Sequence, residues 1–122
     1  MPLLKAHKRL KAWQAAMALV RDVYLITESL PSSERFGLIS QMRRAAVSVP
    51  SNIAEGAARS KDKETIWFYT IARASLSELD TQIELCASLK LIDAPNIALL
   101  STRLEQVDAL LSGLIRFKKS NT

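Results

Sequence analysis

The sequence is poor in residues that interrupt helices and in residues that build catalytic or metal sites. Its 122 residues include three glycines, four prolines, one cysteine and one histidine, and aromatic residues make up 6%. So few turn-forming residues favour long elements over many short ones. A single cysteine excludes an intrachain disulfide and suits a reducing compartment. One histidine and one cysteine leave no ligand set for a zinc or di-iron site, so we expect no metal.

Long apolar runs are also missing, and we expect no leader peptide. No run approaches the roughly 18 apolar residues that a membrane-spanning helix needs. The apolar stretch after the basic N-terminal residues is broken by Arg21 and Asp22, and no convincing cleavage site follows it. No glycine-rich phosphate loop is present. We therefore expect a soluble, cytoplasmic protein with no cofactor and no membrane partner.

The residues that are present predict a helical protein. The chain is 48% hydrophobic and 24% charged, a globular balance. Apolar residues recur at spacings of three and four in four segments, which predicts amphipathic helices. The segments span about residues 7–29, 33–58, 61–90 and 94–119. Short breaks between long helices predict one all-α domain over residues 1–122, an antiparallel up-and-down four-helix bundle with left-handed packing.

Helix ends and one internal proline can also be assigned. Ser32 or Ser33 can cap the second helix, Ser60 the third and Asp93 the fourth, because their side chains accept hydrogen bonds from free backbone N–H groups. Pro50 falls in the middle of the second helix, where it removes one backbone hydrogen bond. The apolar period continues past it, so we expect one helix kinked near Pro50 rather than two helices.

More than one apolar stripe is present on some helices. In the first helix the stripe assigned to the core is Leu10, Trp13, Met17, Val20 and Tyr24. The additional apolar residues are Leu19, Val23, Ile26 and Leu30 on the first helix, Ile66, Trp67 and Tyr69 on the third, and Leu99, Leu110 and Ile115 on the fourth. A monomeric bundle needs one apolar face per helix. The extra residues therefore indicate a subunit interface, and a wide core face is the alternative.

A polar stripe runs along the second helix and a second one along the third. Their members are Gln41, Arg44, Ser48, Asn52 and Glu55, and Ser75, Glu78 and Gln82. In an antiparallel pair the two stripes should face each other, with Glu78 buried and ion-paired to Arg43 or Arg44. One interpretation is a ligand site. The other is a buried polar network that fixes helix register, which we favour because His7, the one histidine, lies far away. We therefore predict no catalytic residues and no enzymatic activity.

Basic residues gather at one end of the expected bundle, where the N-terminus, the turn near residue 60 and the C-terminus meet. Ten of the 17 lysines and arginines belong to this end, and we call them the basic end: Lys5, Lys8, Arg9, Lys11, Arg59, Lys61, Lys63, Arg116, Lys118 and Lys119. The acids there are Glu55, Asp62 and Glu64. Such an end could contact RNA or DNA, or could only keep the protein in solution. Phe117 is the one aromatic among these lysines, so we expect sequence-blind binding with little base stacking.

Two stretches resemble a known family. The run FGLISQMRRAAVSVPSNIAEG from Phe36 to Gly56, and IARASLSEL from Ile71 to Leu79, are similar to motifs of the 23S rRNA intervening-sequence proteins, a family of four-helix bundles. The resemblance covers most of the chain and implies a barrel-like homopentamer. A related group, the accessory proteins of diversity-generating retroelements, uses a basic surface with nucleic acid. The resemblance supplies no catalytic residues. The function we predict is a non-enzymatic oligomeric accessory protein that binds RNA or DNA; a scaffold for another protein is the alternative.

Overall fold

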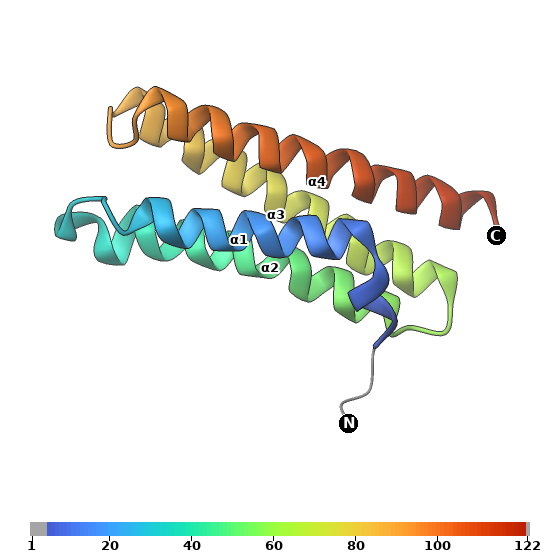
Figure 1. Cartoon of the computed structure of the whole chain (residues 1–122). Helices are drawn as coiled ribbons and strands as arrows, with labels where there is room; N and C mark the ends of the chain where they lie inside the picture. The colour runs from blue at the N-terminus through green and yellow to red at the C-terminus, as the bar shows by residue number, and fades with distance from the viewer. Residues whose placement is uncertain (1–4, 122) are drawn as a thin grey trace.

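Four helices dominate the computed structural model, which describes residues 5–121 (Figure 1). They are α1 (Lys11–Thr27), α2 (Ser40–Ala57), α3 (Asp62–Ser88) and α4 (Ala94–Ser120). Three short helical segments complete the structure: the 3-10 helices η1 (Ala6–Arg9) and η2 (Ser32–Glu34), and the π-helix η3 (Arg35–Ile39). α3 and α4 have 27 residues each, which corresponds to about 40 Å at 1.5 Å per residue.

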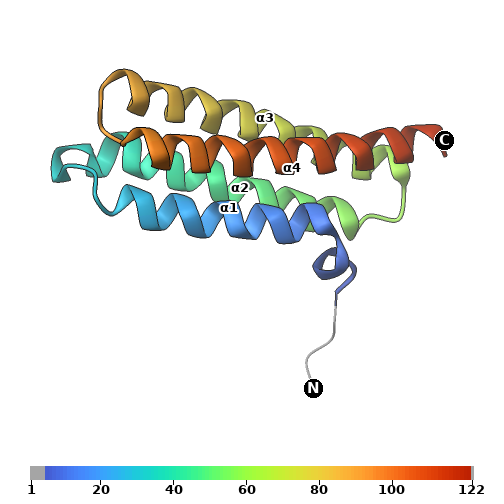
Figure 2. The ribbon, with the colours of Figure 1, turned by 45° about the horizontal axis from the view of Figure 1, so that its top comes forward.

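The helices form the antiparallel bundle that the sequence predicts. α1 packs against α2, α2 against α3, α3 against α4, and α4 returns to α1. The two chain ends and the α2–α3 connection lie at one end of the bundle, and the other two connections lie at the opposite end (Figures 1 and 2). Short connections between long helices account for this arrangement, because successive helices must then reverse direction.

A single core of buried side chains runs along the bundle axis, and in α1 it differs from our assignment. The buried residues of α1 are Ala12, Ala16, Leu19, Val23, Ile26 and Thr27. The stripe assigned to the core lies at the edge instead: Trp13, Met17 and Val20 are half-buried, and Tyr24 is 41% exposed. The small Ala12 and Ala16 let α1 approach its neighbours closely on one face, and this places the branched residues after them in the core.

The entry into α2 is irregular, where we expected a continuous helix from residue 33. The chain passes from the 3-10 turn η2 into the π-helix η3, and Gly37 has non-helical dihedrals (φ −104°, ψ −110°). The change of winding turns Phe36 away from the core, and this residue is 89% exposed. α2 then continues through Pro50 without a break, which confirms one helix at that point. The bend near Pro50 stays a prediction.

Helix ends partly follow the assigned caps. The Asp93 carboxylate accepts a hydrogen bond from the Asn96 backbone N–H at 3.0 Å and caps α4 as predicted. Ser60 does not cap α3: Lys61 holds the N-cap position without a side-chain bond. α1 begins after Leu10, whose backbone is extended, so the predicted start at His7 belongs to η1. Among residues 5–121, no helix combines the length and the apolar character needed to cross a bilayer.

Candidate nucleic-acid interface

The basic end is assembled as the topology requires. Its residues come from η1, the start of α1, the α2–α3 connection, the first turn of α3 and the last turns of α4, and Figure 1 shows these segments at the same end of the bundle. All ten cations of the basic end are exposed except Lys118, which is half-buried. Lysines in the last turn of α4 lie at the negative end of its dipole, and acids in the first turn of α3 lie at the positive end. Because the C-terminus of α4 favours cations and the N-terminus of α3 favours acids, both signs of charge occur at this end of the bundle.

Two of these cations already have carboxylate partners. Arg59 Nη2 lies 2.8 Å from Glu55 Oε2, one turn earlier in the chain. Lys118 Nζ lies 3.3 Å from Asp62 Oδ1 and joins α4 to α3. All four side chains keep between 32% and 56% of their surface exposed. Exposed pairs of this kind contribute about 0–1 kcal/mol, so an incoming anion can exchange with either carboxylate at small cost.

Aromatic side chains accompany the cations, and our reading of the sequence missed most of them. The Arg59 guanidinium lies over the Phe68 ring, 4.7 Å from its centroid. Phe117 is 61% exposed. In addition, the His7 and Trp13 rings meet edge to face at 5.1 Å. Phe68 follows Lys61 and Lys63 by only a few residues. This closeness in sequence could have indicated that an aromatic ring lies at the basic end. The expectation of an end almost without aromatic groups is therefore wrong.

A cavity of about 280 Å³ opens between the helix ends of the basic end. It is lined by Ala6, Leu10, Ala57, Arg59, Thr65, Tyr69, Leu114, Phe117 and Lys118. The Thr65 hydroxyl donates to the Gly56 carbonyl at 2.8 Å and thereby satisfies the last turn of α2. Tyr69 is 2% exposed, and burial raises the pKa of its hydroxyl above the ordinary value. This hydroxyl therefore stays protonated and can donate a hydrogen bond at neutral pH.

The predicted polar stripe is brought together only in its central part. The Ser48 and Ser75 hydroxyls are 2.8 Å apart, and Asn52 Nδ2 donates to the Ser48 hydroxyl at 3.0 Å and to the Ser48 carbonyl at 2.9 Å. These three half-buried residues link α2 to α3. Gln41 and Arg44 are exposed instead. Because the three central side chains satisfy one another, the arrangement has the form of a network that fixes helix register.

Glu78 is exposed, and the prediction of a buried pair with Arg43 or Arg44 is wrong. Its carboxylate accepts a hydrogen bond from Gln82, whose Nε2 lies 3.5 Å from Glu78 Oε2. Arg43 turns toward α1, where its Nε donates to the Thr27 hydroxyl at 3.0 Å and its Nη2 to the Tyr24 carbonyl at 3.2 Å. The expected antiparallel pairing of α2 and α3 is correct, but the sequence pattern could not determine the direction in which each side chain leaves its helix.

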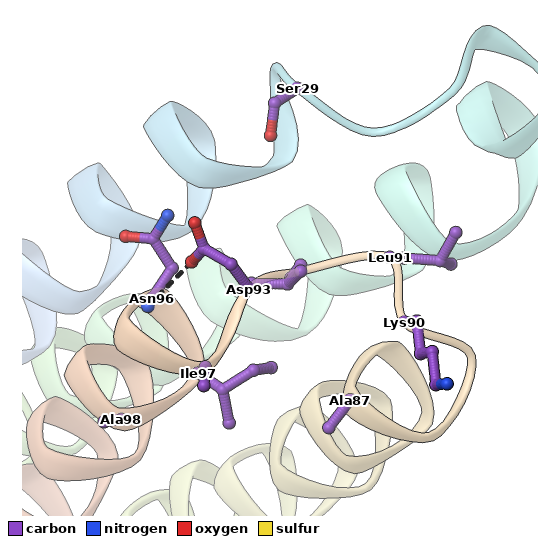
Figure 3. Close-up of a pocket in the computed structure, with 10 residues that line it drawn as sticks. Ser29, Ala87, Lys90, Leu91, Asp93, Asn96, Ile97 and Ala98 are labelled. Carbon is purple, nitrogen blue, oxygen red and sulfur yellow. Dashed lines mark hydrogen bonds between the residues drawn. The ribbon is translucent and has the colours of Figure 1, made fainter.

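Another hollow lies at the opposite end of the bundle. It measures about 740 Å³ and is lined by the α3–α4 connection and the adjoining helix ends, together with Ser29 from the segment that follows α1. Figure 3 shows Asp93 occupied by its capping bond to Asn96, while Ser29 and Lys90 stand on separate elements. Its polar groups therefore do not converge on one point. Within residues 5–121, no group of three or more His, Cys, Asp or Glu side chains is placed to hold a metal ion.

Cys86 behaves as a core residue, as its helical period predicts. Its side chain is buried and its Sγ lies 3.6 Å from Met42 Sδ. Burial, with a smaller contribution from the negative charge of Glu34, raises the pKa of the thiol. The thiolate that a nucleophile requires is thus disfavoured.

Comparison with known proteins identifies the family to which this bundle belongs. No curated protein matches the chain. The model of the 23S rRNA-intervening sequence protein family matches residues 8–113, a span that reaches from η1 into α4 and includes both motifs quoted from the sequence. Since the match covers most of the chain and the bundle agrees with the fold the motifs imply, the chain belongs to the 23S rRNA-intervening sequence protein family.

Proposed function

We propose that this protein is a cytoplasmic, non-enzymatic, oligomeric accessory protein that binds RNA or DNA through its basic end. The observation that carries the proposal is the gathering of ten cations from five segments onto one end of the bundle, against three acids. Clustered lysines and arginines bind phosphates largely independently of sequence. The name of the family, which refers to 23S rRNA, agrees with a role near RNA.

Oligomerisation would multiply this surface. Apolar side chains remain exposed on two different faces: Trp67, Leu85 and Leu89 on α3, and Val47 beside half-buried Trp13 at the α1–α2 groove. Contacts between two different patches of identical chains are heterologous, and they must close into a ring or continue as a filament. The family resemblance implies a ring of five. A ring repeats the basic end in every subunit and raises avidity without any new contact.

A salt titration tests the binding. We expect wild-type protein to bind an oligonucleotide with an affinity on the order of micromolar near physiological salt, measured by fluorescence anisotropy. Replacement of Lys8, Lys61 and Lys63 by glutamate should lower the slope of log affinity against log salt by about 2 to 3, because each lost phosphate contact contributes about 0.9. These three lysines are exposed, so the bundle should still fold.

The matched control carries the same change in net charge at the far end. Arg35, Arg44 and Lys90 are exposed as well, and their replacement by glutamate should leave the slope close to that of the wild type. Equal losses in both triple variants would mean that net charge, and not the basic end, governs binding. Absence of any salt-sensitive binding by wild-type protein at low salt would overturn the proposal and favour the alternative, a scaffold that binds another protein.

A further inference from the structure

The cavity at the basic end combines apolar, cationic and aromatic side chains in one lining. Apolar side chains from three helices and η1 line it, and the cationic Arg59 and Lys118 and the exposed ring of Phe117 belong to the same lining. The remaining cations of the basic end lie on the segments around it. An apolar recess surrounded by positive charge fits a ligand that carries an apolar, planar group between negative groups.

The Tyr69 side chain offers the cavity a hydrogen-bond donor. It is 2% exposed and lines the cavity. No hydrogen bond within residues 5–121 involves its hydroxyl, and this hydroxyl is not completely enclosed by protein. Among the side chains lining this cavity, the Tyr69 hydroxyl can therefore donate to a polar edge of an inserted group.

The size and the surroundings of the cavity narrow the choice of ligand. Its volume of about 280 Å³ lies at the lower limit of small-molecule pockets, about 300 Å³, and suits one ring system rather than a long chain. Phe117, and Phe68 beneath the Arg59 guanidinium, offer aromatic and cation–π surfaces of the kind on which unpaired bases stack. Besides Arg59 and Lys118 in the lining, further cations of the basic end belong to η1, α3 and α4, as a polymer of phosphates would require and a single headgroup would not.

We propose that the cavity receives an unstacked base of a single-stranded nucleic acid while neighbouring phosphates lie on the surrounding cations. This inference rests on the proposed function and adds to it a preference for single strands. In a duplex the bases are paired and stacked, and extrusion of one costs a few kcal/mol. Arg59 and Lys118 exchange their exposed carboxylate partners, Glu55 and Asp62, for phosphate oxygens when the strand binds.

The test uses three oligonucleotides of the same length, about 12 nucleotides, which is within the range that one single-strand site covers. One is an oligouridylate, the second is the same sugar–phosphate chain without any base, and the third is an RNA duplex. We expect the oligouridylate to bind full-length protein at least roughly tenfold more tightly than the other two, because base–aromatic contacts are worth about one order of magnitude or more.

Two phenylalanine variants connect the preference to the cavity. Phe117→Ala should reduce the advantage of the oligouridylate over the base-free chain to about twofold or less. Phe36→Ala, which removes an exposed phenylalanine at the far end, should leave that advantage unchanged. Tyr69→Phe keeps the packed ring and removes only the hydroxyl, so it should weaken oligouridylate binding without lowering the melting temperature.

The outcomes separate this inference from the proposed function. If all three ligands bind in a salt-sensitive way with affinities within twofold of one another, the basic end binds phosphates and the cavity takes no base, which overturns the inference alone. Equal effects of Phe117→Ala and Phe36→Ala would overturn it as well. If none of the three ligands binds at low salt, the inference and the proposed function both fail.

Discussion

Single side chains in this bundle matter through partners that are remote in sequence. Ser48 and Ser75 are 27 residues apart in the chain, and their hydroxyls share one hydrogen bond between α2 and α3. Ser48 also accepts from the Asn52 amide. Truncation of one of these three side chains removes a hydrogen-bond partner from another. The effects of substitutions at these positions on stability must therefore be coupled.

A double-mutant cycle on these serines measures the coupling. Ser48→Ala and Ser75→Ala should each lower the free energy of unfolding by about 1 kcal/mol, since each leaves a half-buried hydroxyl without its partner. The double variant should cost less than the sum of the two, because both unsatisfied groups are then gone. Urea unfolding at constant protein concentration provides the values. Strictly additive losses would show that the hydrogen bond contributes nothing to stability.

At the scale of elements, the crossing of α2 and α3 depends on a residue without a side chain. A Cβ atom at Gly56 would stand 2.8 Å from Tyr69 Cε1, 2.9 Å from Tyr69 Cδ1 and 3.1 Å from Phe68 Cβ. Tyr69 is buried against this point, so its ring has little room to move. Gly113 in α4 is different, because the nearest atom to its added Cβ is Arg116 Nη2 at 3.9 Å, the end of a flexible side chain.

The two glycines form a matched pair for substitution by alanine. Gly56→Ala should lower stability by about 1–3 kcal/mol, the usual cost of overpacking, which outweighs a gain in helix propensity of up to about 1 kcal/mol. Gly113→Ala should raise stability by about 0.5–1 kcal/mol, because only the propensity changes. Thermal unfolding followed by circular dichroism distinguishes the two signs. A stabilised Gly56→Ala variant would mean that α3 can shift away from α2 without loss.

At the scale of the whole molecule, the exposed apolar surface is the feature that calls for a partner. Phe36, Leu25 and Trp67 are 89%, 71% and 65% exposed, and they lie on η3, α1 and α3 respectively rather than on one patch. Isolated apolar side chains on a surface are ordinary. Apolar groups repeated along the outward face of α3 and along the α1–α2 groove are typical of contact surfaces.

Light scattering tests whether those surfaces join copies of the chain. We expect a mass that is a multiple of the monomer's, with five subunits as the resemblance implies. Trp67→Glu combined with Leu85→Glu should shift the mass toward the monomer and leave the helical circular dichroism unchanged, because both side chains point away from the core. A wild-type protein that is monomeric at every concentration would contradict the oligomer and leave the exposed apolar residues to another partner.

Local chain chemistry was enough to predict the helices and their order. Spacings of three and four and the Asp93 cap act within a few residues of the chain, and the structure has four helices in the predicted order and the cap at Asp93. Short breaks between long helices fix the antiparallel order, and this order brings the cations of the basic end together. The family could be recognised for a similar reason, since both of its motifs are contiguous.

Only tertiary packing decided how each helix is rotated about its axis. Two apolar stripes of α1 were equally possible core faces, and the close approach that Ala12 and Ala16 permit selected the one that contains Leu19 and Val23. The rotation of the helices about their axes also exposes Glu78 to solvent and directs Arg43 toward Thr27. It places Tyr69 in the lining of the cavity at the basic end. The sequence by itself therefore determined the bundle, its topology and the position of its charge along the axis. The direction of each side chain, and with it the cavity at the basic end, depends on contacts between helices, which no spacing within one helix can specify.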